Sequence, residues 1–192
     1  MAQPDEILGF WLDELSPEDW YTASDTLDET IRQRFLSTFE DTLAGRNGFW
    51  LTYPSGALAY IILTDQFSRN MFRDTARAFS ADRWARAAAK SAIRHGWDLK
   101  IDPPARQFFY MPLMHSENLS DQDHCVRLVC ERMDAEGSTL LHARAHREVI
   151  RRFGRFPFRN AALDRASTEA ETAFMKEGGY GAIVRELEKL AA

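Results

Sequence analysis

Residues 57–63 read ALAYIIL, and this stretch would be apolar on every side of a helix rather than along one stripe. A helix that is apolar all round belongs in the middle of a globular core. The stretch is much shorter than the roughly 18 apolar residues that a membrane span needs. Pro54 and Ser55 suit a helix start, so the sequence predicts a central, buried helix that begins there.

Helical patterns continue on both sides of this segment, and no window alternates as a strand would. Short loops without a long Gly/Ser/Pro linker separate the patterns, which indicates antiparallel helical hairpins in one domain, residues 1–192. The sequence is therefore predicted to be all-α. In the first half of the chain, further helices are expected over 5–14, from Asp25 as N-cap to Gly45 or Gly48, and from Ser80 to Gly96. In the second half they are expected from Pro103 through Met114, from Ser120 to about Ala135 and from Ser138 to about Gly154. One more helix should start at a capping box formed by Thr168 and Glu171, and a final helix should cover 182–190.

The formal net charge of the 192 residues is −5, so there is no overall basic field and nucleic acid is not an expected partner. The first residues contain no basic region followed by an apolar core, as a signal peptide would. Cys125 and Cys130 are five residues apart, which places them on different faces of a helix and indicates a reducing compartment. We expect a cytoplasmic protein without membrane contact.

A first polar cluster follows the apolar stretch and contains Asp65, Gln66, Arg69, Asn70 and Arg73. Asp65 continues the inward face of the central helix, and Arg69 is four residues further on, so the two can pair. Arg73 would follow one turn later if the helix continued. Such a cluster is either a buried ion pair that fixes how helices dock or part of a binding site.

A second cluster comprises Tyr110, His115, Ser116 and Glu117 and lies where Pro112 breaks a helix. His115 and Glu117 could act as a general acid–base pair, because histidine titrates near neutrality. The competing interpretation is that Ser116 and Glu117 cap helix ends and that His115 is a core histidine. Ser116 lacks the Gly-x-Ser-x-Gly context of a hydrolase nucleophile, so capping is the preferred role for it.

The third cluster runs from His146 to Asn160 and includes Arg155 and Arg159 between aromatic residues. Arginine can bind carboxylate or phosphate groups through two parallel hydrogen bonds. Basic residues near a helix C-terminus can instead simply offset its dipole, which is the simpler interpretation of Arg147 and Arg151.

His142 and His146 have metal-ligand spacing, but no third ligand is evident and Ala143 replaces the glutamate of the zinc-protease motif. There is also no phosphate-binding loop and no Gly-x-Gly-x-x-Gly motif. We therefore expect neither a metal nor a cofactor.

Four stretches together are similar to a bacterial family known only as a domain of unknown function, numbered nine-two-four in that series. They are LAYIILTDQFSRN (58–70), Phe72-Arg73 with Ala78-Phe79, FYMPLMHSE (109–117), and the segment from His146 through RFGRFPFRN (152–160). Three positions depart from the usual pattern: Ser68 replaces a proline, Asp74 a glycine and Phe158 a histidine. We interpret Phe158 as a packing residue.

The resemblance implies an all-α fold like that of tetratricopeptide-repeat proteins, built from stacked hairpins, and it implies no established activity. The family's characteristic polar positions map onto Asp65, Gln66, Arg69, Asn70, Arg73, Tyr110, His115, Ser116, Glu117, His146, Arg155, Arg159 and Asn160.

Three hypotheses remain open at this level. In the preferred one, an arginine- and asparagine-rich groove binds a small anionic molecule or a carboxylate-bearing peptide. In the second, the protein is a hydrolase or transferase that uses His115 as general base, oriented by Glu117 or Asp65. In the third, the polar residues only hold the helices together. Oligomeric state, substrate and pathway are not predicted.

Overall fold

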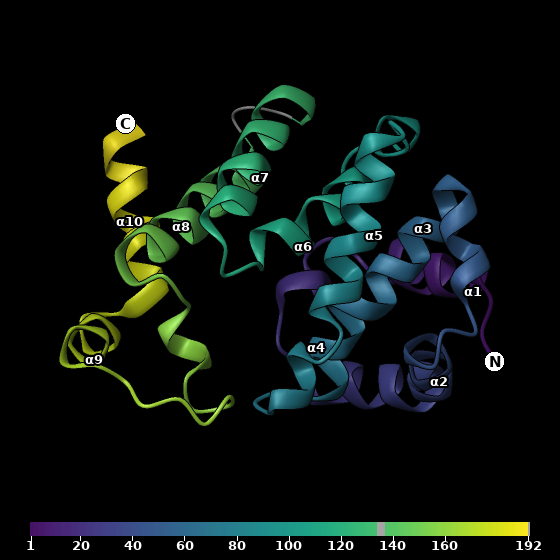
Figure 1. The fold of residues 1–192 in the computed structure, drawn as a ribbon, viewed down its shortest axis with the longest axis horizontal. Helices are drawn as coiled ribbons and strands as arrows, with labels where there is room; N and C mark the ends of the chain where they lie inside the picture. The colour runs from purple at the N-terminus through teal and green to yellow at the C-terminus, as the bar shows by residue number, and fades with distance from the viewer. Residues whose placement is uncertain (134–136, 192) are drawn as a thin grey trace. The chain divides into compact units, whose positions relative to one another are not determined.

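The computed structural model describes residues 1–133 and 137–191, and within these ranges the chain forms helices and connecting turns without a strand (Figure 1). The predicted all-α class is confirmed. The chain divides into two compact units, Met1–Pro112 (unit 1) and Leu113–Ala192 (unit 2). The single domain expected over residues 1–192 stays a prediction.

Unit 1 is organised around the apolar stretch that begins at residue 57. Every residue from 56 to 68 is buried, as predicted for a central helix. Large rings surround this helix and include Trp11, Phe35, Phe67 and Phe108, each at most 1% exposed. The α-helices of this unit are α1 (Pro4–Leu8), α2 (Asp25–Leu43), α3 (Pro54–Ile61), α4 (Ser68–Met71) and α5 (Asp82–Arg94), and α6 (Met111–Met114) crosses its boundary with unit 2.

A π-helical segment, Ile62–Phe67, joins α3 to α4 and carries Asp65 and Gln66 of the first polar cluster. Such wide turns interrupt the regular pattern of backbone hydrogen bonds. Two side chains bond to backbone carbonyls around it: the Thr64 hydroxyl donates to the Tyr60 carbonyl at 2.7 Å, and the Ser68 hydroxyl donates to the Thr64 carbonyl at 2.9 Å. The chain thus places Asp65 and Gln66 inside the core while its buried carbonyls stay hydrogen-bonded.

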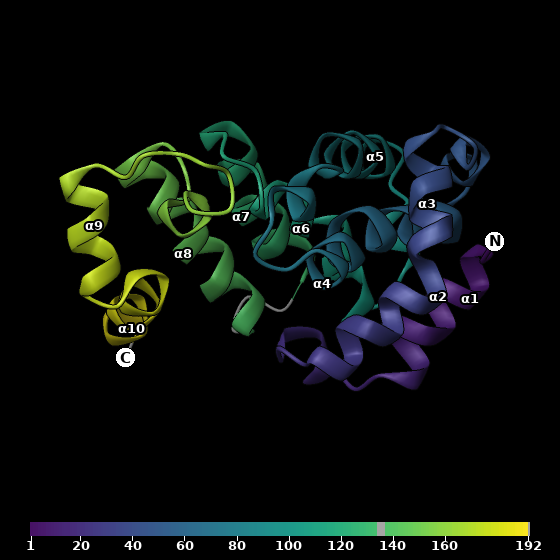
Figure 2. The ribbon, with the colours of Figure 1, turned by 90° about the horizontal axis from the view of Figure 1, so that it is seen from below.

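Unit 2 contains α7 (Leu119–Arg132), α8 (Ser138–Phe153), α9 (Glu169–Lys176) and α10 (Gly179–Ala191). Helix α8 packs against both α7 and α10 (Figure 2). Its inward side chains form a separate apolar cluster with residues of the later helices. The buried members of this cluster are Ala145, Val149, Ile150, Phe156, Phe174 and Ile183.

Two helix starts differ from the sequence prediction. The N-cap of α2 is Ser24, whose hydroxyl accepts a hydrogen bond from the Leu27 N–H, and Asp25 is the first helical residue. The N-cap of α7 is Asn118, which accepts from two backbone N–H groups, so the predicted start at Ser120 is two residues late. In both cases a neighbouring polar residue of equal capping strength occupies the cap.

Other predicted boundaries also have a physical explanation. The box of Thr168 and Glu171 at the start of α9 is confirmed. Helix α5 begins at Asp82 rather than Ser80, and it ends as expected before Gly96, which has a φ of +67°. The residues after Pro104 form a 3₁₀ helix, Ala105–Phe109, instead of an α-helical first turn. The C-terminal end that was expected near Ala135, for the helix beginning at Ser120, lies outside the described residues.

None of the helices in the described ranges combines the length and the apolar character that crossing a bilayer requires.

The close approach of α3 to the preceding turn depends on Gly56. A Cβ at this position would lie 2.5 Å from the Trp50 carbonyl oxygen and 2.5 Å from the Tyr53 ring. We expect Gly56→Ala to lower the free energy of unfolding by about 1–3 kcal/mol, as forced overpacking does. Urea unfolding measures this change.

Gly48→Ala is the matched control, because nothing lies within 4 Å of a Cβ at that position. It should change stability by less than about 0.5 kcal/mol. If the two substitutions lowered the free energy of unfolding equally, the close contacts of Gly56 with Trp50 and Tyr53 would not be the cause of the destabilisation.

Candidate functional site

The predicted pair of Asp65 and Arg69 is present inside unit 1. Asp65 is completely buried, and its carboxylate lies 3.3 Å from the Arg69 guanidinium. The Arg69 guanidinium also lies 3.1 Å from the Asp82 carboxylate on α5, and Gln66 donates to Asp65 at 2.5 Å. Burial opposes the charge of Arg69, but the two carboxylates outweigh it and raise the pKa of the guanidinium.

Asn70 and Arg73 converge on one buried carboxylate, Asp28 of α2. Arg73 donates to it through Nε at 2.7 Å and Nη2 at 2.9 Å, and Asn70 donates at 2.7 Å. Because α4 ends at Met71, the helix does not continue to Arg73, so Arg73 does not lie one turn after Arg69 on the same helical face. Asp74 has a φ of +60°, which explains why the family pattern favours glycine at this position.

A depression of about 600 Å³ surrounds these residues. Four carboxylates line it against two guanidinium groups, so its charge does not favour an anionic ligand. The acidic residues are Asp25, Asp28, Glu29 and Asp74, and the basic ones are Arg32 and Arg73.

Tyr110 is the remaining predicted binding residue in unit 1. Its ring is fully buried, and its hydroxyl donates to the buried Asp98 carboxylate at 2.7 Å. The Tyr110 hydroxyl therefore already has a hydrogen-bond partner inside unit 1, as buried polar groups normally do.

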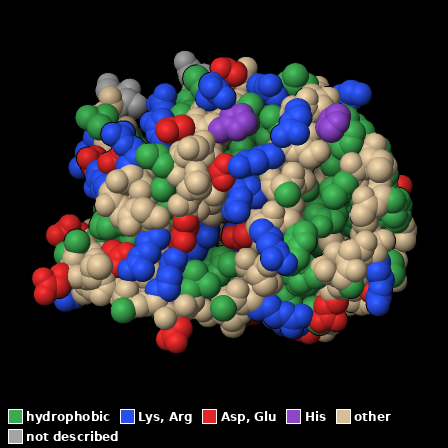
Figure 3. All heavy atoms as spheres, viewed as in Figure 1, with side chains coloured by type: hydrophobic (Ala, Val, Ile, Leu, Met, Phe, Trp, Pro, Cys, Tyr) green, Lys and Arg blue, Asp and Glu red, His purple; other side chains and the backbone are tan. Residues whose placement is uncertain are grey.

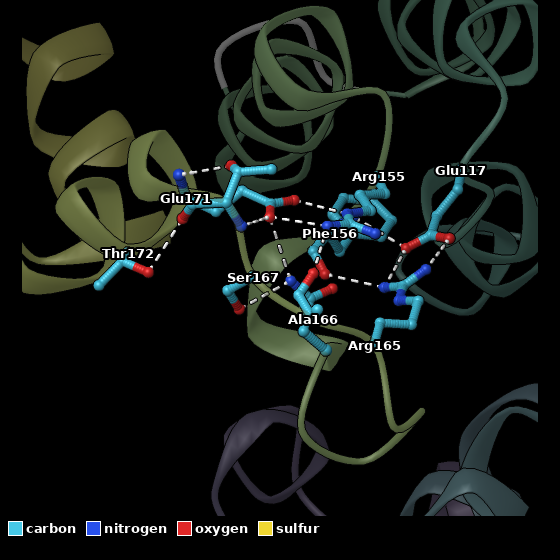
Figure 4. Close-up of polar contacts among 10 residues, drawn as sticks. Glu117, Arg155, Phe156, Arg165, Ala166, Ser167, Glu171 and Thr172 are labelled. Carbon is cyan, nitrogen blue, oxygen red and sulfur yellow. Dashed lines mark hydrogen bonds and ion pairs between the residues drawn. The ribbon is translucent and has the colours of Figure 1, made fainter.

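In unit 2, Ser116 and Glu117 connect the start of α7 to the turn that follows α8. The Ser116 hydroxyl donates to Asp121 at 2.8 Å. Glu117 accepts from the Phe156 N–H at 2.8 Å and from both terminal nitrogens of Arg165 at 2.7 and 3.0 Å (Figure 4). Burial opposes ionisation of Glu117, but these donors outweigh it and lower the pKa of the carboxyl group. Glu117 thus binds the backbone of the turn between α8 and the 3₁₀ helix Pro157–Arg159.

Arg155 and Asn160 both donate to Glu171, a carboxylate that is 2% exposed (Figure 4). The two Arg155 bonds measure 2.5 and 2.7 Å. Together with the Thr168 N–H, they lower the pKa of Glu171 to about 2. On the face drawn in Figure 3, Lys and Arg side chains are likewise interspersed with Asp and Glu side chains.

The residues that form the most unusual polar group in unit 2 are His115, His142, His146 and Tyr180, which we call the histidine–tyrosine cluster. His142 and His146 are one turn apart on α8, and Tyr180 comes from the start of α10. The Tyr180 hydroxyl lies 2.7 Å from His142 Nδ1 and 3.2 Å from His146 Nδ1. The rings of His115 and His146 are 6.1 Å apart.

The hydrogen bonds of the cluster assign its tautomers. His146 Nδ1 lies 2.9 Å from the His142 carbonyl, so Nδ1 carries the proton and donates. Tyr180 then donates to His142 Nδ1. His146 Nε2 is left as an acceptor, and it forms no hydrogen bond within residues 1–133 and 137–191. Burial, followed by the nearby His115 and Arg159, lowers the pKa of His146 from 6.5 to about 3.

Arg159 and two phenylalanines border this cluster. The Arg159 guanidinium lies over the Phe156 ring at 4.4 Å, and Phe156 packs edge-on against His146 at 5.5 Å. Phe158, at the position where the family pattern favours histidine, is 41% exposed and stacks on Phe156. Its ring is also 6.4 Å from that of Tyr180, so it extends the aromatic border.

The predicted site residues are thus divided between the units. The first cluster and Tyr110 belong to unit 1, and the other two clusters belong to unit 2. Sequence reasoning missed Asp28, Arg165 and Tyr180 as contributors. Their partners are 34 to 48 residues away along the chain, and no helical spacing connects residues that far apart. The His142–His146 spacing was a usable signal. Among the described residues, no group of three or more metal-ligating side chains is assembled.

The low pKa of His146 predicts how stability depends on pH. Its pKa is about 3 in the folded state and 6.5 without the fold, so the unfolded chain binds more protons between these values. Stability should fall as the pH is lowered below 6.5, by at most about 1.4 kcal/mol per pH unit from this residue. We expect His146→Gln to flatten the change in melting temperature between about pH 7 and about pH 5.

His95→Gln is the matched control, because His95 is an exposed histidine of unit 1. It should keep the wild-type slope. If His146→Gln keeps that slope as well, His146 is not held neutral in the folded protein.

The match to known proteins covers most of the chain. A protein of unknown function from Agrobacterium tumefaciens has a solved structure that is 34% identical, with a TM-score of 0.86 over 91% of this chain and 97% of that one. No curated protein matches the chain. The model of a family described as bacterial protein of unknown function (DUF924) matches residues 7–179. The chain is therefore a member of the DUF924 family, as its sequence motifs predicted.

Proposed function

We propose that unit 2 is a binding module for a small molecule or peptide end that carries an anionic group, and that the ligand binds at the histidine–tyrosine cluster. The observation that carries this proposal is the neutral imidazole of His146. Its Nε2 is an unused acceptor within the described residues, and the positive charge of Arg159 is close enough to lower its pKa. Perturbed titratable groups gathered with aromatic side chains are typical of binding sites.

The chemistry of these groups limits which classes of ligand could bind. Arg159 supplies a positive charge for a carboxylate or phosphate group. His146 Nε2 can only accept, so the ligand must present a hydroxyl or an amide N–H beside its anionic group. A hydroxycarboxylate and the carboxyl end of a peptide both have this combination. Phe158 offers an exposed ring for the apolar part of the ligand.

Three arginines of the predicted arginine- and asparagine-rich groove are not part of the proposed ligand site. Arg69, Arg73 and Arg155 each bind one or more carboxylates of their own unit. An anionic ligand would have to compete with these internal partners. Their pairing supports a structural role, and the proposal places the ligand at His146 Nε2, near Arg159.

A hydrolase or transferase activity is the second candidate, and the proximity of His115 to His146 favours it. A neutral imidazole can accept a proton from a reacting group. Glu117 shares its carboxylate with Arg165 and the Phe156 N–H, and Asp65 is bound to Gln66 and Arg69 in unit 1. A base in this mechanism would therefore be His115, with His146 rather than a carboxylate as its polar neighbour.

We also propose that the helices stack as hairpins in the manner of tetratricopeptide-repeat proteins and that the protein acts in the cytoplasm. The packing of α7 on α8, and of α9 on α10, supports the first point.

Thermal unfolding with a ligand panel tests the binding proposal. The panel contains hydroxycarboxylates, inorganic phosphate and dipeptides with a free carboxylate. A ligand at about 100 times its dissociation constant should add roughly 2.7 kcal/mol, which raises the melting temperature by about 5 to 10 °C. His115→Ala and Tyr180→Phe should remove most of this increase, because each deletes a polar group of the cluster while leaving the helices intact.

His95→Ala, which lies in unit 1, should preserve the increase in full. The proposal is wrong if no anionic ligand stabilises the wild type, or if the increase is the same in all variants. Product formation from a stabilising ligand, lost in His115→Ala, would favour the enzyme over the binding module.

A further inference from the structure

A second, chemically different pocket opens at the surface of unit 1, with the exposed residues Ala87 and Ser91 in its wall. Its volume is about 180 Å³. An engineered cavity of about 150 Å³ with apolar walls is large enough to bind benzene. The pocket is lined by Leu51, Ala57, Tyr60, Trp84, Ala87, Ala88, Ser91 and Trp97.

The sequence creates this pocket by combining small and large residues on two facing helices. Trp84, Ala88 and Ser91 follow helical spacing on α5 and therefore share one face. On α3, Ala57 and Tyr60 are also one turn apart. Alanine at the centre leaves space that the aromatic rings at the ends cannot fill, so the pocket has flat aromatic walls.

Tyr60 provides the polar group of the pocket. Its side chain is only 5% exposed, and its hydroxyl forms no hydrogen bond within the described part of the chain. The hydroxyl is not among the fully buried side-chain atoms that lack a partner, and Tyr60 lines the pocket, so a bound molecule can reach it. Burial raises the pKa of Tyr60, so the hydroxyl stays protonated and can donate. A ligand with an oxygen or nitrogen atom at one end would supply the missing partner.

The charges around the pocket distinguish between ligand types. Aromatic walls could in principle hold a cation over their faces. However, the Arg83 guanidinium already lies 3.6 Å from the centre of the Trp84 ring, and His95 stacks on Trp97 at 5.0 Å. Helix α5 carries four basic residues against one acidic residue, Asp82. A second cation is therefore disfavoured. The lining itself contains no charged side chain that would bind an anion, so an uncharged ring is favoured.

We propose that unit 1 binds a small neutral aromatic molecule, between benzene and indole in size, whose single polar atom hydrogen-bonds to the Tyr60 hydroxyl. This site is independent of the anion site proposed in unit 2. It shares no residue with the histidine–tyrosine cluster and needs no positive charge from the protein.

Calorimetric titration of the full chain with phenol, toluene and tetramethylammonium tests this proposal. Phenol and toluene should both bind, and phenol should bind more tightly. Tyr60→Phe, which removes only the hydroxyl, should weaken phenol binding by about 3- to 10-fold and leave toluene binding unchanged within about 2-fold. Ala88→Leu, which fills the pocket, should abolish binding of both rings.

Absence of ring binding to the wild type would overturn the proposal. Tighter binding of tetramethylammonium than of phenol would overturn the choice of ligand, and unchanged phenol binding in Tyr60→Phe would overturn the role of the hydroxyl. Ala88→Leu must first be shown to fold by its circular dichroism. If it does not fold, the Tyr60→Phe comparison still decides the outcome.

Discussion

The structure depends on one constraint, which is that a carboxylate buried among helices must be matched by donors. Asp28, Asp65 and Glu171 are each no more than 6% exposed, and each is bound by an arginine of a family motif. Removing one partner of such a pair leaves an uncompensated buried charge, which is strongly destabilising. The pairs therefore determine which segments can pack against α2, α4 and α9.

This constraint separates the polar residues of the motifs into two groups. Arg69, Arg73 and Arg155 belong to the first group, whose charges are balanced inside the protein. The histidine–tyrosine cluster belongs to the second group, since burial lowers the pKa of His142 and His146, and His146 Nε2 accepts no hydrogen bond from the described residues. A ligand donor that binds His146 Nε2 displaces no hydrogen bond of the described residues at that atom.

Local features were the ones that the sequence predicted well. The buried helix over residues 57–63 and the pairing of Asp65 with Arg69 both follow from helical spacing, and both are present. Helix starts were displaced by one or two residues where two capping residues compete, as at Ser24 and Asn118. The family was recognised from motifs spread along most of the chain.

Contacts between distant segments could not be predicted from spacing. Arg73 would follow Arg69 by one turn only if the helix continued, but the helix ends at Met71 and the side chain reaches Asp28, 45 residues away. Tyr180 has an ordinary sequence context, and only the packing of α10 on α8 brings it to His146. The apolar pocket at Tyr60 also depends on how α3 and α5 face each other, which no single helix pattern reveals.

The most direct test of this account is a double-mutant cycle on Asp28 and Arg73, measured by urea unfolding with Asp28→Asn, Arg73→Met and the combined variant. The hydrogen bond from Asn70 is affected equally in both arms of the cycle, so the coupling reports on the ion pair. The account predicts a coupling energy of at least about 0.5 kcal/mol. A coupling energy near zero would contradict it, because Arg73 would then be available to a ligand rather than committed to the fold.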